Sequence, residues 1–378
     1  MKKELIIILI LVLIPLTSAE IIINEKPVEL YNLGDTIELP VKIAATANLQ
    51  GIFHMYIICN GVQQEFYKNG INLASGEEKS LSTTLLLSGE IIGGATGECK
   101  IKASLNNEFV LTDAFLVSNL ITIELNMKES EFSPGNSISV QGKAIKQNGG
   151  LSDGFVEIEI PGTEKENSSR IIIRDTLKKG YFSANFSLPE KIAAGSYTLN
   201  IKAYEKDPAE NITNQGFATY NIKIRQIPKT LEIFFEEKEI KPGVNLKVKA
   251  ILHDQTGEKI NSIAIITIKD SKGKIFTQKE VKIDEFLEFP IKYNQAPEEW
   301  DVVAVSNQLT SESTFKIIEK KEIKIELINK TLIITNLGNV PYNDTIIIKI
   351  GRETLNINTE LEVDEEKKYI LSAPDGEY

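Results

Sequence analysis

The chain has 378 residues, of which 42% are hydrophobic and 25% charged, and its formal net charge is −11 from 42 basic and 53 acidic residues. This composition is ordinary for a globular protein and excludes wholesale disorder, and the length allows about two to four domains. The two signs of charge are interspersed without a basic block, so the positive patch that binds nucleic-acid phosphates is missing. No nucleic-acid partner is expected.

The first 19 residues follow the order of a secretory signal peptide. Lys2 and Lys3 precede an apolar run over residues 5–16, and small residues lead up to Ala19, after which we expect cleavage. The alternative is an uncleaved membrane anchor, but the run is shorter than the roughly 20 residues needed to span a bilayer. We therefore expect an extracellular or cell-surface protein that associates with a membrane only through this segment or through sequence beyond Tyr378.

Two short patterns recur along the chain. One pattern is a strand in which apolar and polar residues alternate, with a glycine or an aromatic residue near its start. It is found at residues 97–103, 195–204, 298–305 and 375–378. A Pro-Gly pair precedes another alternating strand at Pro134 and at Pro242. Because these patterns repeat at the length of a small domain, they predict an array. We expect a signal peptide at 1–19, complete repeats at 20–118, 119–227 and 228–320, and an incomplete repeat at 321–378.

Alternating apolar residues predict six strands in the first repeat, at 21–23, 36–43, 52–59, 80–87, 99–103 and 109–117. Pro40 predicts that the second of these is an edge or bulged strand. The only two cysteines, Cys59 and Cys99, lie on the apolar faces of two strands, which favours a disulfide in an exported protein. Two separate buried thiols are the alternative. Without a CxxC motif or a nearby histidine pair, no redox or zinc site is predicted.

The second repeat has seven predicted strands, at 121–125, 138–144, 155–160, 170–177, 181–188, 197–204 and 218–224. Short strands at this spacing, with no helical period, are typical of an antiparallel immunoglobulin-like sandwich. The third repeat follows the same plan, with a hairpin turn at 269–274 and with Trp300 at the core position of Tyr197. The fold class is therefore all-β, a tandem array of immunoglobulin-like β-sandwich domains.

The last repeat contains the sequence Asn-Leu-Gly-Asn at residues 336–339, followed by Val340 and Pro341. It resembles the NxGN turn of CARDB-like and S-layer-associated immunoglobulin-like domains of secreted archaeal and bacterial proteins. The middle repeats are similar to bacterial Ig-like and macroglobulin-type domains in their Pro-Gly opening and Gly-x-Tyr strand. The resemblance implies a β-sandwich in a surface or structural protein and no particular activity. Since Tyr378 matches Tyr197, we expect the last repeat to lack two closing strands and to be poorly stable.

No group of residues predicts catalysis, cofactor binding or metal binding. His54 and His253 are the only histidines and lie in different repeats, His54 on a solvated strand face and His253 beside a hairpin. Acidic stretches lack the order of a tight calcium loop, and hydrolase and nucleotide-binding motifs are missing. Five sequons are candidates for glycosylation in an exported protein: Asn167, Asn185, Asn211, Asn329 and Asn343.

The sequence therefore favours a non-enzymatic cell-surface or secreted structural, spacer or adhesion ectodomain that contacts protein or carbohydrate partners of unknown identity. The alternative is the N-terminal part of a larger protein, such as a macroglobulin-like protease trap or an extracellular hydrolase.

Overall fold

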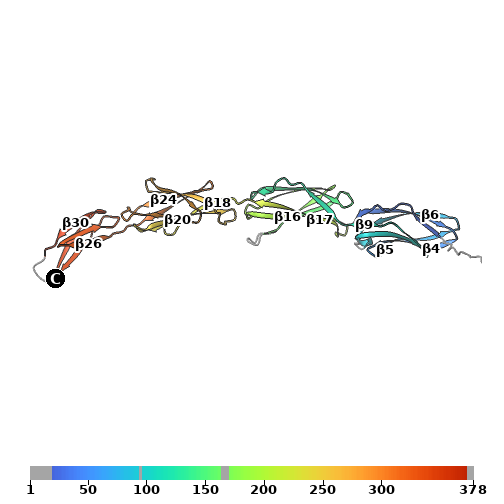
Figure 1. Cartoon of the computed structure of the whole chain (residues 1–378), viewed down its shortest axis with the longest axis horizontal. Coiled ribbons are helices and arrows are strands. Elements are labelled where there is room, and N and C mark those ends of the chain that lie inside the picture. Colours follow the sequence, from blue (N-terminus) through green and yellow to red (C-terminus); the bar gives the residue numbers. More distant parts are fainter. Residues whose placement is uncertain (1–18, 93–95, 163–169, 373–378) are drawn as a thin grey trace, which may run out of the picture. The chain divides into compact units, whose positions relative to one another are not determined.

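A computed structural model describes residues 19–92, 96–162 and 170–372. Residues 1–18 of the expected signal peptide, the sequon at Asn167 and the segment 375–378 lie outside the described residues. Figure 1 shows that the described chain is built from small β-sheets in succession. The expected all-β array of immunoglobulin-like sandwiches is confirmed, whereas the boundaries between its domains stay a prediction.

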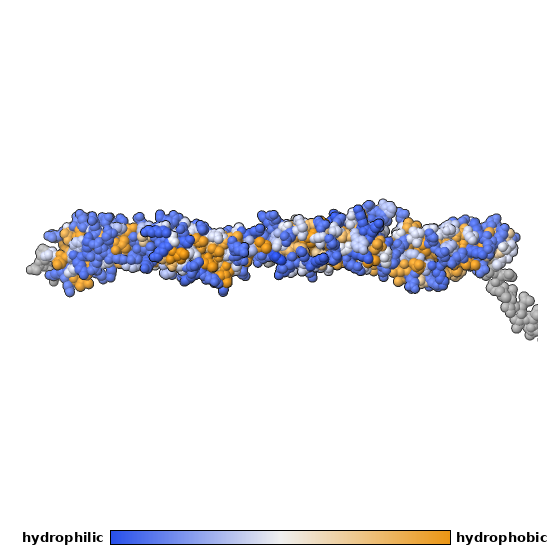
Figure 2. Space-filling model, turned by 90° about the horizontal axis from the view of Figure 1, so that it is seen from above, coloured by the Kyte–Doolittle hydropathy of each residue, from blue (hydrophilic) through white to orange (hydrophobic). Residues whose placement is uncertain are grey.

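Contacts within the chain divide it into two units, an N-terminal half that comprises most residues up to Lys223 and a C-terminal half that comprises most residues from Ile224 on. The first and second sandwiches lie in the N-terminal half, and the third and fourth lie in the C-terminal half. On the face seen in Figure 2, hydrophobic residues occur in patches separated by hydrophilic ones.

The first sandwich packs a three-stranded sheet against a larger one. The smaller sheet has the order β1 (Ala19–Ile23), β3 (Thr36–Ala45), β6 (Glu78–Leu86). The larger sheet has the order β2 (Leu30–Asn32), β9 (Phe115–Ser118), β7 (Gly97–Leu105), β4 (Leu49–Cys59), β5 (Val62–Leu73), and β8 (Glu108–Leu111) also pairs with β7. A short helix, α1 (Gly89–Ile92), follows β6. Alternate residues of β3 and β4, such as Leu39 and Phe53, meet in the core. Ala19, the expected last residue of the signal peptide, is buried in β1.

The second sandwich repeats this plan with clear alternation on every long strand. Its smaller sheet has the order β10 (Ile121–Leu125), β12 (Ser137–Lys146), β15 (Tyr181–Ser187). Its larger sheet has the order β11 (Glu131–Phe132), β17 (Ile212–Ile224), β16 (Gly195–Lys206), β13 (Gly154–Ile160), β14 (Ile171–Leu177). Tyr197, Leu199 and Ile201 of β16 are buried, as the alternation predicts.

The third sandwich has the same strand order. Its smaller sheet is β18 (Pro228–Phe235), β20 (Asn245–Asp254), β23 (Leu287–Pro290), and its larger sheet is β19 (Glu239–Ile240), β25 (Leu309–Ile317), β24 (Glu299–Ser306), β21 (Ile263–Lys269), β22 (Ile275–Lys282). The hairpin expected at 269–274 joins β21 to β22. Trp300 is buried in the core against Phe276, Phe289 and Phe315.

The fourth sandwich has fewer strands within the described residues. It consists of a sheet β26 (Ile323–Ile328), β27 (Thr331–Asn336), β30 (Glu366–Ile370) and a two-stranded sheet β28 (Thr345–Ile350), β29 (Glu353–Asn358). Its core is correspondingly small and is formed by Leu332, Ile334, Ile346, Ile357 and Leu361.

The expectation that Pro40 makes its strand an edge or a bulge is wrong. Strand β3 lies between β1 and β6, and its pairing with β6 continues through Pro40. The carbonyl of Pro40 accepts a hydrogen bond from the backbone N–H of Asn24, so the ring nitrogen of Pro40 also points toward the β1 side. Strand β1 ends at Ile23, and its last paired residue lies opposite Val41. The missing N–H of Pro40 therefore falls where the partner strand has just ended.

The sequence prediction also missed β5 and joined β8 to β9. Strand β5 pairs with β4 along its whole length, yet only Ile71 and Leu73 at its end are buried, so most of it lacks the apolar alternation of a half-buried strand.

Candidate functional site: the turns that hold the linkers

Three sandwiches hold the segment that enters them by the turn after their second long strand. We call residues 147–149, 255–257 and 337–339 the linker-holding turns; they follow β12, β20 and β27. In each turn one amide side chain, from Gln147, Gln255 or Asn339, hydrogen-bonds with the incoming segment. The turns lie where the chain passes from one sandwich to the next.

Gln147 holds the entry to the second sandwich. Its backbone N–H donates to the carbonyl of Leu120 at 3.2 Å, and its side-chain oxygen accepts from the hydroxyl of Ser118 at 2.5 Å. The backbone N–H of Leu120 donates in turn to the Ser118 hydroxyl oxygen at 3.1 Å. Ser118 is the last residue of β9, so these bonds tie the end of the first sandwich to the turn after β12 in the second.

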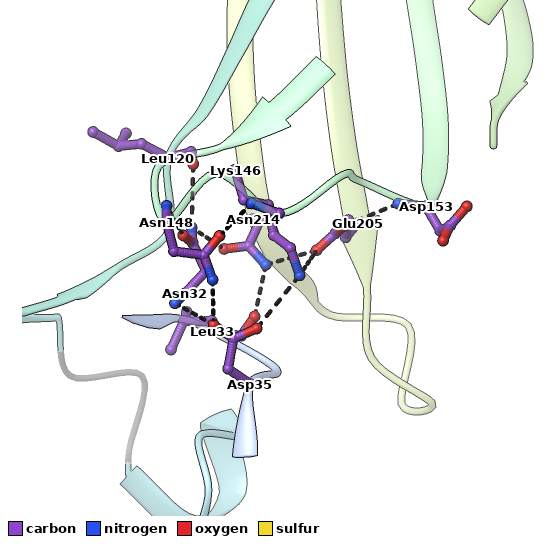
Figure 3. Close-up of polar contacts among 10 residues, drawn as sticks. Asn32, Leu33, Asp35, Leu120, Lys146, Asn148, Asp153, Glu205 and Asn214 are labelled. Carbon is purple, nitrogen blue, oxygen red and sulfur yellow. Dashed lines mark hydrogen bonds and ion pairs between the residues drawn. The ribbon is translucent and has the colours of Figure 1, made fainter. Parts of the chain in front are cut away.

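Two fully buried asparagines join the same sandwiches directly (Figure 3). Asn32 lies at the end of β2 and Asn214 lies in β17. Asn32 Nδ2 donates to Asn214 Oδ1 at 3.1 Å and to the carbonyl of Leu120 at 3.2 Å. Asn214 Nδ2 donates to the carbonyl of Leu33 and to Glu205 Oε2, both at 2.7 Å. A buried amide that loses its partner costs about 1–3 kcal/mol, so these bonds favour one arrangement of the two sandwiches.

A mostly buried group of charges surrounds the two asparagines. Lys146 Nζ lies 3.5 Å from Asp35 Oδ1 and 4.0 Å from Glu205 Oε2, between two carboxylates that come from different sandwiches. Asn148 Nδ2 donates to Asp35 Oδ2 at 2.6 Å, and the backbone N–H of Asn148 donates to Asn32 Oδ1 at 3.0 Å. Figure 3 shows these side chains converging on the two asparagines, with Asp35 in the turn after β2, Lys146 at the end of β12, Asn148 in the turn that follows and Glu205 in β16.

The entering segment also runs close beside β17. Leu120 forms a parallel bridge with Gln215, whose backbone N–H donates to the carbonyl of Asn119 at 2.8 Å. A Cβ atom at the neighbouring Gly216 would lie 1.9 Å from the carbonyl oxygen of Ile121. Only glycine allows this approach, because any side chain would collide with backbone.

Gln255 holds the entry to the third sandwich in the same way. Its side-chain oxygen accepts from the backbone N–H of Ile227 at 2.9 Å, and its Nε2 donates to the carbonyl of Arg225 at 3.4 Å. Asp254 Oδ2 accepts from Gln226 Nε2 at 3.0 Å, and its other oxygen accepts from Thr256 and from the backbone N–H of Glu258. Burial raises the pKa of Asp254, but these hydrogen bonds outweigh burial and hold its pKa below the ordinary value.

Asn339 holds the entry to the fourth sandwich. Its side-chain oxygen accepts from the backbone N–H of Lys320 at 2.7 Å, and its Nδ2 donates to the carbonyls of Ile318 and Gln295, both at 2.9 Å. Its own N–H donates to the carbonyl of Lys320 at 3.0 Å. A Cβ atom at Gly338 would lie 2.3 Å from that same carbonyl oxygen.

The other asparagine of the NLGN sequence serves its own sandwich. Fully buried Asn336 donates from Nδ2 to the carbonyls of Val340, Leu361 and Glu362, and its Oδ1 accepts from the N–H of Gly338. In the NLGN sequence, Asn336 therefore forms hydrogen bonds within the fourth sandwich, and Asn339 forms hydrogen bonds to the third.

A further contact joins the third and fourth sandwiches at the surface. The hydroxyl of Tyr293 and Nδ2 of Asn294 donate to the two carboxylate oxygens of Asp364, both at 2.6 Å. These bonds lower the pKa of Asp364, and the bond to Asp364 raises the pKa of Tyr293.

The linker-holding glutamines were missed by the sequence prediction, although the sequence carries a signal for them. Gln147 and Gln255 are separated by the same number of residues as Pro134 and Pro242, so both are at one position of the repeat. Gly149 and Gly257 share this separation and have φ angles of 85° and 89°, which favour glycine.

The structure contains the disulfide expected between Cys59 and Cys99. It joins directly opposite residues of the neighbouring strands β4 and β7, with a Cα–Cα distance of 4.1 Å, so it lies within one sheet.

His54 lies on the opposite face of β4, as expected, and its Nδ1 is 2.6 Å from Glu65 Oε2. His253 lies in β20, 4.0 Å from Glu232. The two histidines belong to different sandwiches.

The sequons that the structure describes, Asn185, Asn211, Asn329 and Asn343, are all exposed. Whether they are glycosylated stays a prediction.

Among residues 19–92, 96–162 and 170–372, no group of three histidine, cysteine or acidic residues is arranged to hold a metal ion. A search of the same residues for a long apolar helix that could cross a membrane finds none.

No protein-family model and no curated protein matches the chain. It is similar to solved structures of bacterial alpha-2-macroglobulin. These include the trypsin-activated protein from Escherichia coli, at 11% identity and a TM-score of 0.24, with 93% of this chain and 28% of that chain covered. They also include the Escherichia coli protein activated by porcine elastase, at 14% identity and a TM-score of 0.22, covering 87% and 34%. The Salmonella protein reacted with methylamine has 11% identity and a TM-score of 0.24, covering 93% and 27%. The chain spans about a third or less of these structures, and the likeness concerns the multidomain all-β fold alone.

Proposed function

We propose that the chain is a non-enzymatic cell-surface or secreted ectodomain whose immunoglobulin-like domains act as a structural spacer or adhesion module. The observation that carries this proposal is the recurrence of the linker-holding turns, with Gln147, Gln255 and Asn339 each bonded to an entering segment. A spacer needs neighbouring domains in a set arrangement. Buried amide side chains form such joints between the first and second sandwiches and between the third and fourth.

The location at the cell surface or outside the cell rests on three features. The disulfide between Cys59 and Cys99 is typical of an oxidising compartment. The first 19 residues have the order of a signal peptide. The NLGN sequence resembles that of surface-associated domains, which favours the same location. Partners would be proteins or carbohydrates on the same or a neighbouring surface.

The joint between the first two sandwiches provides the test. Dyes placed on the first and second sandwiches would report the distribution of their separation by single-molecule energy transfer. We expect one narrow distribution for the wild-type chain and a broader one for the double variant Asn32→Ala, Asn214→Ala. The control Asn185→Ala, on an exposed face of β15, should leave the distribution narrow. A wild-type distribution as broad as that of the double variant would contradict the spacer, and reproducible hydrolysis by the purified chain would contradict the non-enzymatic assignment.

A further inference from the structure

The outer face of the larger sheet in the second sandwich carries a lysine between two aromatic rings. Lys202 of β16 stands between the buried residues Ile201 and Ala203, so its side chain points away from the core. Its Nζ is 5.2 Å from the ring centroid of Tyr204 and 5.7 Å from that of Phe217, within the range of cation–π attraction. Phe217 of β17 is 69% exposed. A positive charge and an open apolar ring therefore lie side by side on this face.

A hollow of about 300 Å³ adjoins this lysine. Its lining includes one apolar ring and three polar side chains from β16 and β17: Phe217, Asn200, Lys202 and Thr219. The amide of Asn200 and the hydroxyl of Thr219 can each donate and accept hydrogen bonds. Sites for small ligands have this make-up, in which an apolar wall is combined with a few polar groups.

The carboxylates beside the hollow already have partners. Glu157, which lies opposite Lys202 in the register of β13 and β16, is 2.8 Å from Arg174 Nε. Glu159 is likewise 2.6 Å from Arg170 Nε. Among the residues that the structure describes, no carboxylate forms an ion pair with Lys202. Because the protein has a net charge of −11 and still leaves this cation without an ion-pair partner, the charge is available to an anionic ligand.

The first sandwich has the same arrangement on the corresponding strand. Lys102 of β7 lies in the same Ile-Lys-Ala sequence as Lys202. Its Nζ is 5.0 Å from the ring centroid of Phe109, which is 60% exposed, and 6.0 Å from that of Tyr56. The corresponding strand of the third sandwich, β24, contains no lysine. The repetition of a lysine between rings in two sandwiches favours a binding role over a chance contact.

We propose that the face around Lys202 binds an acidic saccharide, with the sugar ring of a uronic acid on Phe217 and its carboxylate on Lys202. This inference rests on the proposed adhesion function and names the class of its partner. The C–H groups of a sugar ring are slightly positive and suit the negative face of an aromatic ring. The carboxylate accepts a charge-assisted hydrogen bond from Nζ, and Asn200 and Thr219 bond sugar hydroxyls.

A uronic acid is the occupant that uses both features of this face. A neutral sugar would leave the charge of Lys202 unpaired. An acidic peptide segment would pair with the lysine and leave the ring of Phe217 uncovered.

The test uses the full chain and tetragalacturonate, an oligomer of galacturonic acid. Binding is followed by the acetylation rate of each lysine, which mass spectrometry resolves residue by residue. Lys249 is the internal control, because it too lies over two aromatic rings but is paired with Asp284 at 2.6 Å. We expect tetragalacturonate to protect Lys202 in a saturable manner and to leave Lys249 unchanged. The methyl ester of the same oligomer keeps the sugar rings and removes the charge, so it should need at least about a tenfold higher concentration.

A pair of variants separates the contribution of the ring from that of the charge. Phe217→Ala should raise the concentration that half-protects Lys202 about tenfold, as the loss of a central aromatic contact does. Because Phe217 is exposed, the core stays intact. The matched control Phe286→Ala removes another exposed ring, beside Lys249, and should change that concentration less than about twofold.

The proposal is overturned if tetragalacturonate does not protect Lys202, if the methyl ester protects it as well as the acid does, or if the two phenylalanine variants act equally. Equal protection by tetraglutamate, which has the charges without the sugar rings, would overturn it in favour of an acidic peptide. A chain that fails these tests and keeps the narrow distance distribution of its first two sandwiches would still be a spacer, so the two proposals can fail separately.

Discussion

Asn32 of the first sandwich donates a hydrogen bond of 3.1 Å to Asn214 of the second, and both side chains are fully buried. Each amide also donates a hydrogen bond to a backbone carbonyl of the other sandwich or its entering segment, Asn32 to that of Leu120 and Asn214 to that of Leu33. Neither sandwich alone can satisfy both amides. The bond therefore couples the stability of one sandwich to the presence of its neighbour.

The first prediction concerns the removal of one buried amide. Asn214→Ala leaves the carbonyl of Leu33 and one bond of Asn32 without their partner, so we expect a loss of about 2 kcal/mol in the free energy of unfolding of the N-terminal sandwiches. Urea unfolding followed by hydrogen exchange measures this loss. Asn185→Ala, on an exposed face, should change the free energy by less than about 0.5 kcal/mol. Equal effects of the two variants would show that the joint adds no stability.

The second prediction concerns Gly216. Gly216→Ala puts a methyl group 1.9 Å from the carbonyl oxygen of Ile121, and backbone cannot move aside as a flexible side chain can. We expect a loss of about 1–3 kcal/mol, of the size that overpacking causes. Gly70→Ala is the matched control, because Gly70 also lies in a strand, is not in the left-handed region, and a Cβ atom added to it would meet nothing within 4 Å. Thermal unfolding measures both variants. A larger loss of stability for Gly70→Ala than for Gly216→Ala would contradict the role of the close approach to Ile121.

The third prediction concerns the disulfide. The bridge between Cys59 and Cys99 spans a sequence separation of 40, for which loop-closure entropy corresponds to about 3 to 4 kcal/mol. The double variant Cys59→Ala, Cys99→Ala should lower the stability of the first sandwich and leave the third unchanged. Hydrogen exchange resolved by peptide reports the two separately. An equal loss of stability in the first and third sandwiches would mean that the effect of removing the disulfide is not local to the first.

The fourth prediction concerns pH at the contact between Tyr293 and Asp364. The folded-state pKa of Asp364 is lowered, so its contribution to stability is present above the carboxyl's ordinary pKa of about 4 and disappears as the pH falls through the lower folded value. The pKa of Tyr293 is raised, so its contribution is present below about pH 10 and disappears as the pH rises through the higher folded value.

Comparison of the wild-type chain with Tyr293→Phe tests both limits. The difference in unfolding free energy should be constant between about pH 5 and pH 9 and shrink at either end. Phe keeps the ring and removes only the hydroxyl, so packing is retained. A difference that grows toward acid pH would show that Asp364 is not the partner that matters.

The sequence predicted the sandwiches from the alternation of buried residues, and this worked wherever a strand has one apolar face. It failed at β5, which is held by its long pairing with β4 and buries only Ile71 and Leu73. It also misjudged Pro40, because the effect of a missing N–H depends on where the neighbouring strand ends, and local sequence does not contain that information.

The joints were harder to predict than the cores. Gln147 and Gln255 are polar residues in turns, and nothing in their immediate neighbours distinguishes them from solvated side chains. Their repeated spacing was the available signal, but its meaning depends on a segment that lies more than 25 residues away in the chain, such as Ser118 for Gln147. Asn339 was singled out by its motif, and the structure supplies the physical role that the motif did not show.

The disulfide has a mechanical consequence because it joins neighbouring strands of one sheet. If the chain is pulled from its two ends, the residues between Cys59 and Cys99 cannot straighten, since tension passes through the sulfur bridge and not along the enclosed loop. At about 3.6 Å per extended residue, the first sandwich would lengthen by roughly 140 Å less on unfolding than it would with the bridge reduced. A redox change would thus set how far this part of the protein extends under load.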